Sequence, residues 1–234
     1  LAGTAIAFVL ALLMVFLRIQ EPDKRNNDFV KIIKIVANKF ARFYIFVIRG
    51  TPMMVQSLIF YYAIFNLFKR TGMSVTEINR VWSLFISGLV TVSLNSTAYL
   101  AEVLRGGILA VDAGQMEAAR SLGMTHWQAM RKVVFPQAIK NSLPAIGNEF
   151  IINIKDSSVL CVLGVSDLMF MTRSVAGIYY KGTECYLIAA TVYLFLTYLS
   201  SLLLKAITGR MTAPDNTKRH QGNQTVDLGL PSSN

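Results

Sequence analysis

The most informative stretch of the sequence is Asp112–Lys140, which reads DAGQMEAARSLGMTHWQAMRKVVFPQAIK. It is too polar to cross a membrane, but its helix start and stop signals are strong. Asp112 suits the N-cap of a first helix, with Gln115 three residues later. Gly123 suits the left-handed position that ends such a helix. These signals predict one short helix that ends at a glycine.

A second helix is predicted directly after this glycine. Thr125 and Gln128 form a Thr-x-x-Gln capping box. Arg131 and Lys132 come later, where the helix dipole favours cations, and Pro136 interrupts or bends the chain. A helical hairpin of this kind serves either as a rigid knob for a soluble partner or as a plain loop, and the residue pattern alone leaves both possibilities open.

The sequence around the hairpin is dominated by apolar stretches. Of 234 residues, 53% are hydrophobic and 15% charged, whereas soluble domains carry about 25% charged residues. A helix that crosses a bilayer needs about 20 mostly apolar residues. Five stretches qualify or nearly qualify: Leu1–Leu17, Phe43–Phe68, Val81–Leu104, Leu143–Leu163 and Tyr186–Ile207. We therefore predict an all-α membrane protein with about five transmembrane helices.

Three of these stretches have special features. The first has basic residues after it and none before it, which is the reverse of a secretory signal. We expect it to be a transmembrane helix, and its first residue, Leu1, suggests that the true start is missing. The second contains Arg49 and Pro52, so its apolar part begins around Met53. The fourth is the weakest, because it contains Glu149, Lys155 and Asp156.

Loop charges predict the orientation. The basic loops carry Lys24, Arg25, Lys31, Lys34, Lys39 and Arg42, then Arg105, Arg120, Arg131, Lys132 and Lys140, and finally Arg210, Lys218 and Arg219. The alternate loops hold only Lys69, Arg70 and Arg80, then Arg173 and Lys181. Cytoplasmic loops are the more basic ones. This predicts an N-terminus outside the cell, and a hairpin and C-terminus in the cytoplasm.

Two segments outside the spans have a recognisable pattern. Residues 28–42 place apolar side chains at helical spacing between lysines, which fits either an interfacial helix or an ordinary cytoplasmic one. The tail 209–234 is polar and is predicted to be a disordered cytoplasmic segment. Residues 1–208 then form one transmembrane domain that contains the loop 112–140.

Several classes of function have little support. The net charge of +10 comes from residues that flank apolar runs, without the spacing of a nucleic-acid-binding module. Cys161 and Cys185 form no CxxC pair, and the two histidines lie in no ligand cluster, so we expect no metal. No catalytic cluster or GxxxxGK[ST] phosphate loop is present, so neither an enzyme nor an ATP-binding chain is expected.

The hairpin also carries a family motif. Glu117-Ala118-Ala119, Gly123, and then Val133, Phe135 and Pro136 resemble the EAA motif of ABC importer permeases. Val133 and Phe135 depart mildly from the isoleucine and leucine of that motif. Further segments are similar to the polar amino acid permeases: Arg49-Gly50-Thr51-Pro52, Val55-Gln56, Leu94-Asn95-Ser96, Ala101-Glu102, Arg105-Gly106-Gly107-Ile108, Gly147-Asn148-Glu149-Phe150 and Lys155-Asp156-Ser157-Ser158.

The resemblance implies a function and its partners. It implies a subunit of an ATP-driven importer in the bacterial inner membrane that forms the pathway for a polar amino acid. Expected partners are a second permease subunit, cytoplasmic ATPase subunits docked on the EAA loop, an extracytoplasmic binding protein and membrane lipid. The ATPase subunits would bind and hydrolyse the ATP, and no cofactor is expected in this chain. The competing hypotheses are a permease for another substrate class and a channel or structural membrane protein.

Polar residues inside the spans are the candidate substrate site, because such residues are costly in a membrane. Asn95, Tyr99 and Glu102 share one helix face, and Glu149, Asn153 and Asp156 share another. A zwitterionic amino acid needs a cation and an anion desolvated together, which Lys155 and Asp156 could supply. The alternatives are polar seams that join helices, an internal Lys155–Asp156 pair, and a Glu102–Arg105 pair at the cytoplasmic end.

Overall fold

The computed structural model describes residues 2–19 and 28–211, and every regular element in those ranges is helical. Lys24 and Arg25 of the first basic loop lie outside them, as does the predicted tail 209–234 from residue 212 onwards. Residues 209–211 were predicted to belong to that tail, but they continue helix α10. Three helices are each long and apolar enough to cross a bilayer: α1 (Ala2–Ile19), α5 (Leu84–Leu109) and α10 (Gly182–Met211). Two further pairs of consecutive helices are each bent at a short break. If each pair forms one span, the number of spans rises to five.

Helix α5 is the centre of the molecule. It packs against α1, α2 (Asp28–Gly50), α3 (Met53–Arg70) and α8 (Phe135–Asp156). Alanines at the contact between α1 and α5, Ala7, Ala11, Ala98 and Ala101, are at most 1% exposed. Small residues let helix backbones approach closely where the hydrophobic effect between helices is weak. The α1–α5 contact is therefore close, and it is extended by the apolar face of α2.

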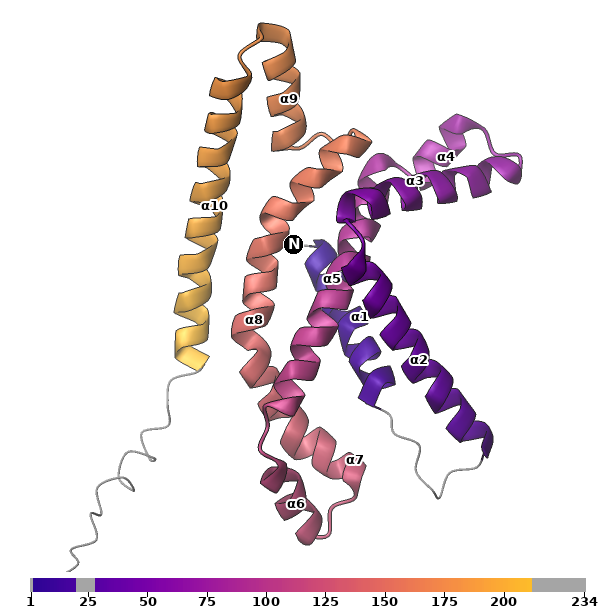
Figure 1. Cartoon of the computed structure of the whole chain (residues 1–234), viewed down its shortest axis with the longest axis vertical. Helices are drawn as coiled ribbons and strands as arrows, with labels where there is room; N and C mark the ends of the chain where they lie inside the picture. The colour runs from indigo at the N-terminus through magenta and orange to yellow at the C-terminus, as the bar shows by residue number, and fades with distance from the viewer. Residues whose placement is uncertain (1, 20–27, 212–234) are drawn as a thin grey trace, which may run out of the picture.

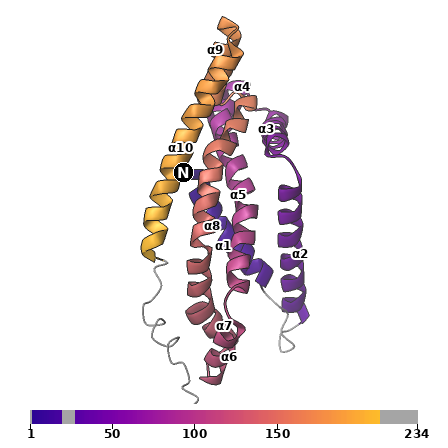
Figure 2. The ribbon, with the colours of Figure 1, turned by 60° about the vertical axis from the view of Figure 1, so that its left-hand side comes forward.

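The outer helices flank this centre on two sides. Figures 1 and 2 both show α10 on one flank and α2 on the other, with α1, α5 and α8 between them. Helix α10 contacts α8 and α9 (Leu168–Tyr179), and most of its surface is exposed within this single chain. Helix α10 is therefore the span that the rest of this chain covers least.

The predicted second span is broken. Helix α2 runs without interruption from Asp28 to Gly50, so the amphipathic segment 28–42 is its first half and not a separate helix. Helix α3 begins at Met53, as predicted, but it is bent from α2 by 113°. Pro52 causes the break because it has no N–H to continue the α-helical hydrogen bonds. Figure 1 shows α3 lying across the upper end of α2 and α5.

Two further helices were not predicted. Helix α4 (Val75–Val81) begins at Ser74, whose hydroxyl and backbone N–H donate to the Glu77 carboxylate at 2.7 and 2.8 Å. These hydrogen bonds hold the pKa of Glu77 below its ordinary value. Helix α9 begins at Asp167, which accepts a hydrogen bond from the Phe170 N–H at 2.7 Å. Both N-caps are visible in the sequence as Ser-x-x-Glu and Asp-x-x-Phe.

Candidate functional site

The hairpin 112–140 forms as predicted at its first helix, with one difference. Asp112 caps α6 (Ala113–Ser121) by accepting a hydrogen bond from the Gly114 N–H at 2.6 Å. Gln115 closes no capping box. Instead, its side-chain carbonyl accepts a hydrogen bond from the Gln137 amide at 3.2 Å. Gln115 therefore ties the hairpin to the start of α8.

The turn between the two hairpin helices is also confirmed. Gly123 has a φ of +84°, in the left-handed region. The Met124 N–H donates to the Ala119 carbonyl at 3.2 Å, which satisfies one of the free carbonyls at the end of α6. Thr125 and Gln128 form the predicted capping box at the start of α7 (His126–Ala129).

Pro136 does not stop the second helix. The chain passes from α7 through a π-helical turn, Met130–Val134, directly into α8. At its end the Phe135 N–H donates to the Met130 carbonyl, five residues back. Pro136 then follows within the first turn of α8, where its missing N–H is tolerated. The hairpin is therefore joined to the fourth predicted span by unbroken helix.

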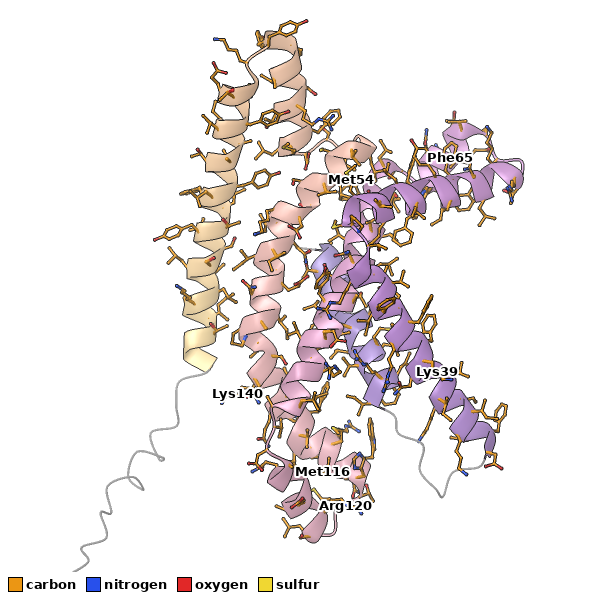
Figure 3. The ribbon with its side chains drawn as sticks, viewed as in Figure 1. Lys39, Met54, Phe65, Met116, Arg120 and Lys140 are labelled. Carbon is orange, nitrogen blue, oxygen red and sulfur yellow. The ribbon has the colours of Figure 1, made fainter. Side chains whose placement is uncertain are left out.

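The motif residues divide between the surface and the interior. Glu117 and Ala118 are exposed, whereas Ala119 is 4% exposed. Leu122 is 82% exposed, which is unusual for a leucine and marks an apolar tip. Met116 and Arg120 lie at the end of the molecule opposite α3 and α9 (Figure 3). The hairpin therefore projects a surface of mixed charge, with the apolar Leu122 at its tip, away from the spans.

One aromatic contact ties this hairpin to α1. The rings of Phe16 on α1 and Trp127 on α7 meet edge to face, with centroids 5.6 Å apart. Phe16 lies close to the end of α1. The hairpin is thus held against both α8 and α1.

The predicted Glu102–Arg105 pair is confirmed and is larger than expected. The Arg105 Nη2 and Nε atoms both lie 2.9 Å from Glu102 Oε2. Arg18 on α1 also forms an ion pair with Glu102. The Glu102 carboxylate thus pairs with two guanidinium groups, and its pair with Arg18 joins α1 to α5.

An open cleft of about 460 Å³ lies beside this pair. Arg42 and Arg49 of α2 line its other side, and Tyr99 borders it. The Arg49 guanidinium lies over the Tyr99 ring, 5.3 Å from its centroid, which is the geometry of a cation–π contact. Within the described ranges neither Arg42 nor Arg49 forms an ion pair. The cleft therefore carries net positive charge.

The two predicted asparagines are buried between helices. The Asn153 carbonyl accepts a hydrogen bond from Ser96 on α5 at 3.0 Å, and its amide donates to Thr4 on α1 at 3.3 Å. The Asn95 amide donates to the Gln56 carbonyl on α3 at 2.9 Å. Both asparagines thus join α5 to its neighbours by hydrogen bonds. This is the arrangement expected if the polar residues form seams that hold helices together.

The predicted acidic residues differ in burial. Glu149 is 8% exposed and forms no hydrogen bond or ion pair with any described residue; Arg49 and Asp156 are the charged groups that act on it. Asp156 and Lys155 are exposed at the end of α8 and form no ion pair in the described ranges. The structure thus places the Arg49 guanidinium over Tyr99, buries Glu149, and leaves Lys155 and Asp156 at the surface of the single chain.

Two residues that contact the predicted polar residues are not among the predicted ones. Arg49 lies over Tyr99, and Gln56 accepts a hydrogen bond from Asn95. The sequence marks both only by their resemblance to a family pattern. The signal that could have found Arg49 is a cation followed by Gly-Thr-Pro in an apolar stretch, which marks a helix end. Among the described residues, no group of three His, Cys, Asp or Glu side chains could hold a metal ion.

Comparisons with known proteins agree on one family. Residues 33–213 match the family described as binding-protein-dependent transport system inner membrane component. The glutamine transport system permease protein GlnP of Escherichia coli (strain K12) is 34% identical over 176 residues, which is 75% of this chain and 76% of that protein. The probable amino-acid permease protein YxeN of Bacillus subtilis (strain 168) is 36% identical over 182 residues, 78% of each chain.

A solved structure is similar over most of the chain. The crystal structure of an amino acid ABC transporter with histidines has a TM-score of 0.72 and 40% sequence identity, and covers 89% of this chain and 87% of that chain. The fold, the projecting hairpin and the sequence match thus point to the same conclusion. This chain is a multi-pass membrane permease subunit and belongs to the family of binding-protein-dependent transport system inner membrane components.

Proposed function

We propose that this chain forms the membrane pathway of an ATP-driven importer for a polar amino acid. The observation that carries the proposal is the capped hairpin, which projects Glu117, Ala118 and Leu122 from the end of α5 and α8. This surface suits a soluble ATPase subunit that binds and hydrolyses the ATP. The amino acid substrate is supported by relatives and a solved structure named for amino acid transport.

The proposed assembly has further members. A second permease subunit, the same or related, would pair with this chain and cover part of the exposed α2 and α10 surfaces. An extracytoplasmic binding protein would deliver the amino acid, and lipid would cover the remaining apolar surface. ATP-driven movement of the partner would then push on α6 and α7, and the helices would rock about a site in the membrane.

The proposed substrate site combines one cation and one anion. Arg49 would bind the substrate carboxylate and Glu149 its ammonium group, with Tyr99 between the two helices that carry them. Asp156 and Lys155 lie about two turns beyond Glu149 on α8 and would act where the substrate enters or leaves. Asn95 and Asn153 would border the site while their amides join the helices.

A substitution at Asp156 tests the site. Because Asp156 is exposed and forms no ion pair in the described ranges, Asp156→Asn should change the free energy of unfolding by less than about 0.5 kcal/mol. We expect uptake to fall by at least tenfold. The measurement is labelled amino acid uptake into proteoliposomes that hold the whole complex, beside its thermal stability. Glu184→Gln, an exposed carboxylate on α10, is the matched control. Wild-type uptake by Asp156→Asn would remove this residue from the site.

The orientation is tested by cysteine labelling. Loop charges place the α6–α7 hairpin inside the cell and α4 outside it. In a background without Cys161 and Cys185, a cysteine at the exposed Thr76 should react with an impermeant thiol reagent in intact cells. One at the exposed Gln128 should react only after the cells are opened. The opposite pattern would reverse the proposed topology.

A further inference from the structure

The break between α2 and α3 is closed by a single side chain. The Gln56 side-chain amide, from the first turns of α3, donates to the Ile48 carbonyl at 2.7 Å, to the Thr51 carbonyl at 2.9 Å and to the Thr51 hydroxyl at 2.8 Å. Gln56 is only 4% exposed. One amide from α3 thus reaches back to the end of α2 and across the connecting residues.

These hydrogen bonds satisfy groups that the break leaves free. The last carbonyls of a helix have no partner within it, and an unpaired carbonyl in a membrane costs several kcal/mol. Thr51 Oγ1 donates to the Val47 carbonyl at 2.8 Å, and Gln56 supplies the donor for Ile48. Gln56 therefore makes the sharp bend between α2 and α3 tolerable, because it supplies the donor that the Ile48 carbonyl would otherwise lack.

The Gln56 side chain is itself fixed from α5. The Asn95 amide donates to the Gln56 carbonyl oxygen at 2.9 Å, in a fully buried contact. This hydrogen bond orients the Gln56 amide so that its N–H groups point to the end of α2 and its oxygen to α5. Helices α2, α3 and α5 meet at this one side chain, which we call the Gln56 clamp together with Thr51 and Asn95.

The clamp lies beside the proposed substrate cation. Arg49 directly follows Ile48, whose carbonyl the clamp holds, and its guanidinium lies over Tyr99, one helical turn beyond Asn95 on α5. Gln56 thus joins α2 to α5 from α3, and the Arg49–Tyr99 contact joins the same two helices directly. We propose that Gln56 is a positioning residue for transport: it fixes the angle between α2 and α3, holds Arg49 over Tyr99, and acts on the substrate only through Arg49.

The first test measures the angle without transport. Lys39 on α2 and Phe65 on α3 mark the two arms of the bend in Figure 3. Two spin labels are attached to cysteines at the exposed positions Lys39 and Leu67, in a background without Cys161 and Cys185. Double electron–electron resonance spectroscopy then measures the distance between the two arms. Gln56→Met removes the donor and keeps the side-chain length. We expect one narrow distance in the parent and a clearly broader distribution in Gln56→Met; an unchanged distribution overturns the inference.

The second test asks whether Gln56 acts through Arg49, and it rests on the proposed function. Arg49→Gln and Gln56→Met should each raise the KM for uptake about tenfold, and the double variant should be no worse than Arg49→Gln alone. Residues that act through one another are non-additive in this way. A purely structural role would lower the amount of folded complex and leave its KM unchanged. Asn66→Leu, an exposed amide on α3, is the control.

The outcomes separate the two claims. If the wild-type complex takes up no amino acid, the proposed function fails, and the distance measurement still decides on the clamp. If Arg49→Gln leaves the KM unchanged, Arg49 is not a substrate ligand, and the link from Gln56 to the substrate fails with it. If the double variant multiplies the two single effects to about a hundredfold, Gln56 acts independently of Arg49, and the inference is overturned while amino acid import stands.

Discussion

Replacing Gly107 by alanine is expected to separate α8 from α5, whereas the same change at Gly106 is expected to leave the protein intact. A Cβ atom at Gly107 would lie 2.6 Å from the Ala138 carbonyl oxygen and would collide with the Ser142 hydroxyl. The carbonyl is backbone, hydrogen-bonded by Ser142 at 2.8 Å, so it cannot rotate away. Overpacking of this kind costs about 1–3 kcal/mol, and here α8 must move as a whole.

Gly106 is a matched control in the neighbouring position. A Cβ atom there meets nothing within 4 Å, and alanine favours a helix over glycine by about 1 kcal/mol. The measurement is the fraction of purified protein that remains monodisperse after heating, for both variants and the parent. Equal stability of Gly107→Ala and Gly106→Ala would show that α5 and α8 do not approach as closely as described.

Replacing Gly123 by valine is expected to abolish most uptake while the spans remain folded. A Cβ atom at Gly123 would meet nothing within 4 Å, so the cost arises from the backbone alone. At a φ of +84° a side chain costs roughly 1–2 kcal/mol, and more for a β-branched residue. The turn between α6 and α7 would therefore open and displace Glu117 and Leu122 from the proposed ATPase contact.

The control for this turn is Gly123→Asn, because asparagine tolerates the left-handed region. Uptake and ATP hydrolysis are measured on the same reconstituted complex. We expect Gly123→Val to lose at least tenfold in uptake and Gly123→Asn to stay within about twofold of the parent. Glu117→Lys should also weaken uptake, since it reverses an exposed charge near the start of α6. Normal transport by Gly123→Val would exclude the hairpin as the coupling element.

Features that depend on neighbouring residues could be predicted from the sequence. The apolar stretches were found because a spanning helix is a matter of local length and composition. The helix signals of the hairpin depend on residues at most three positions apart. They are the N-cap at Asp112, the capping box at Thr125 and Gln128, and the left-handed Gly123. The Glu102–Arg105 pair was predicted for the same reason, because it joins positions i and i+3 of one helix.

Features that depend on distant residues could not be predicted. Pro52 indicates a break, but the 113° angle depends on Gln56 and on Asn95, which lies 39 residues further along the chain. Arg18 meets Glu102 across 84 residues, and no local pattern relates them. The pairing of Lys155 with Asp156 rests on their adjacency in the sequence, whereas the contact of Arg49 with Tyr99 joins two different helices.

The π-helical turn at Met130–Val134 has a geometrical consequence. Each residue of a helix advances the side chains by about 100° around its axis, and a wide turn amounts to one residue more than an α-helix would use. That additional residue sets the rotational phase of α7 relative to α8. If the π-helical turn had one residue fewer, Trp127 would be rotated about the helix axis by about 100° away from Phe16. Alignments of this family should therefore allow a single-residue gap here, and relatives with the gap would present a different side of the hairpin to α1.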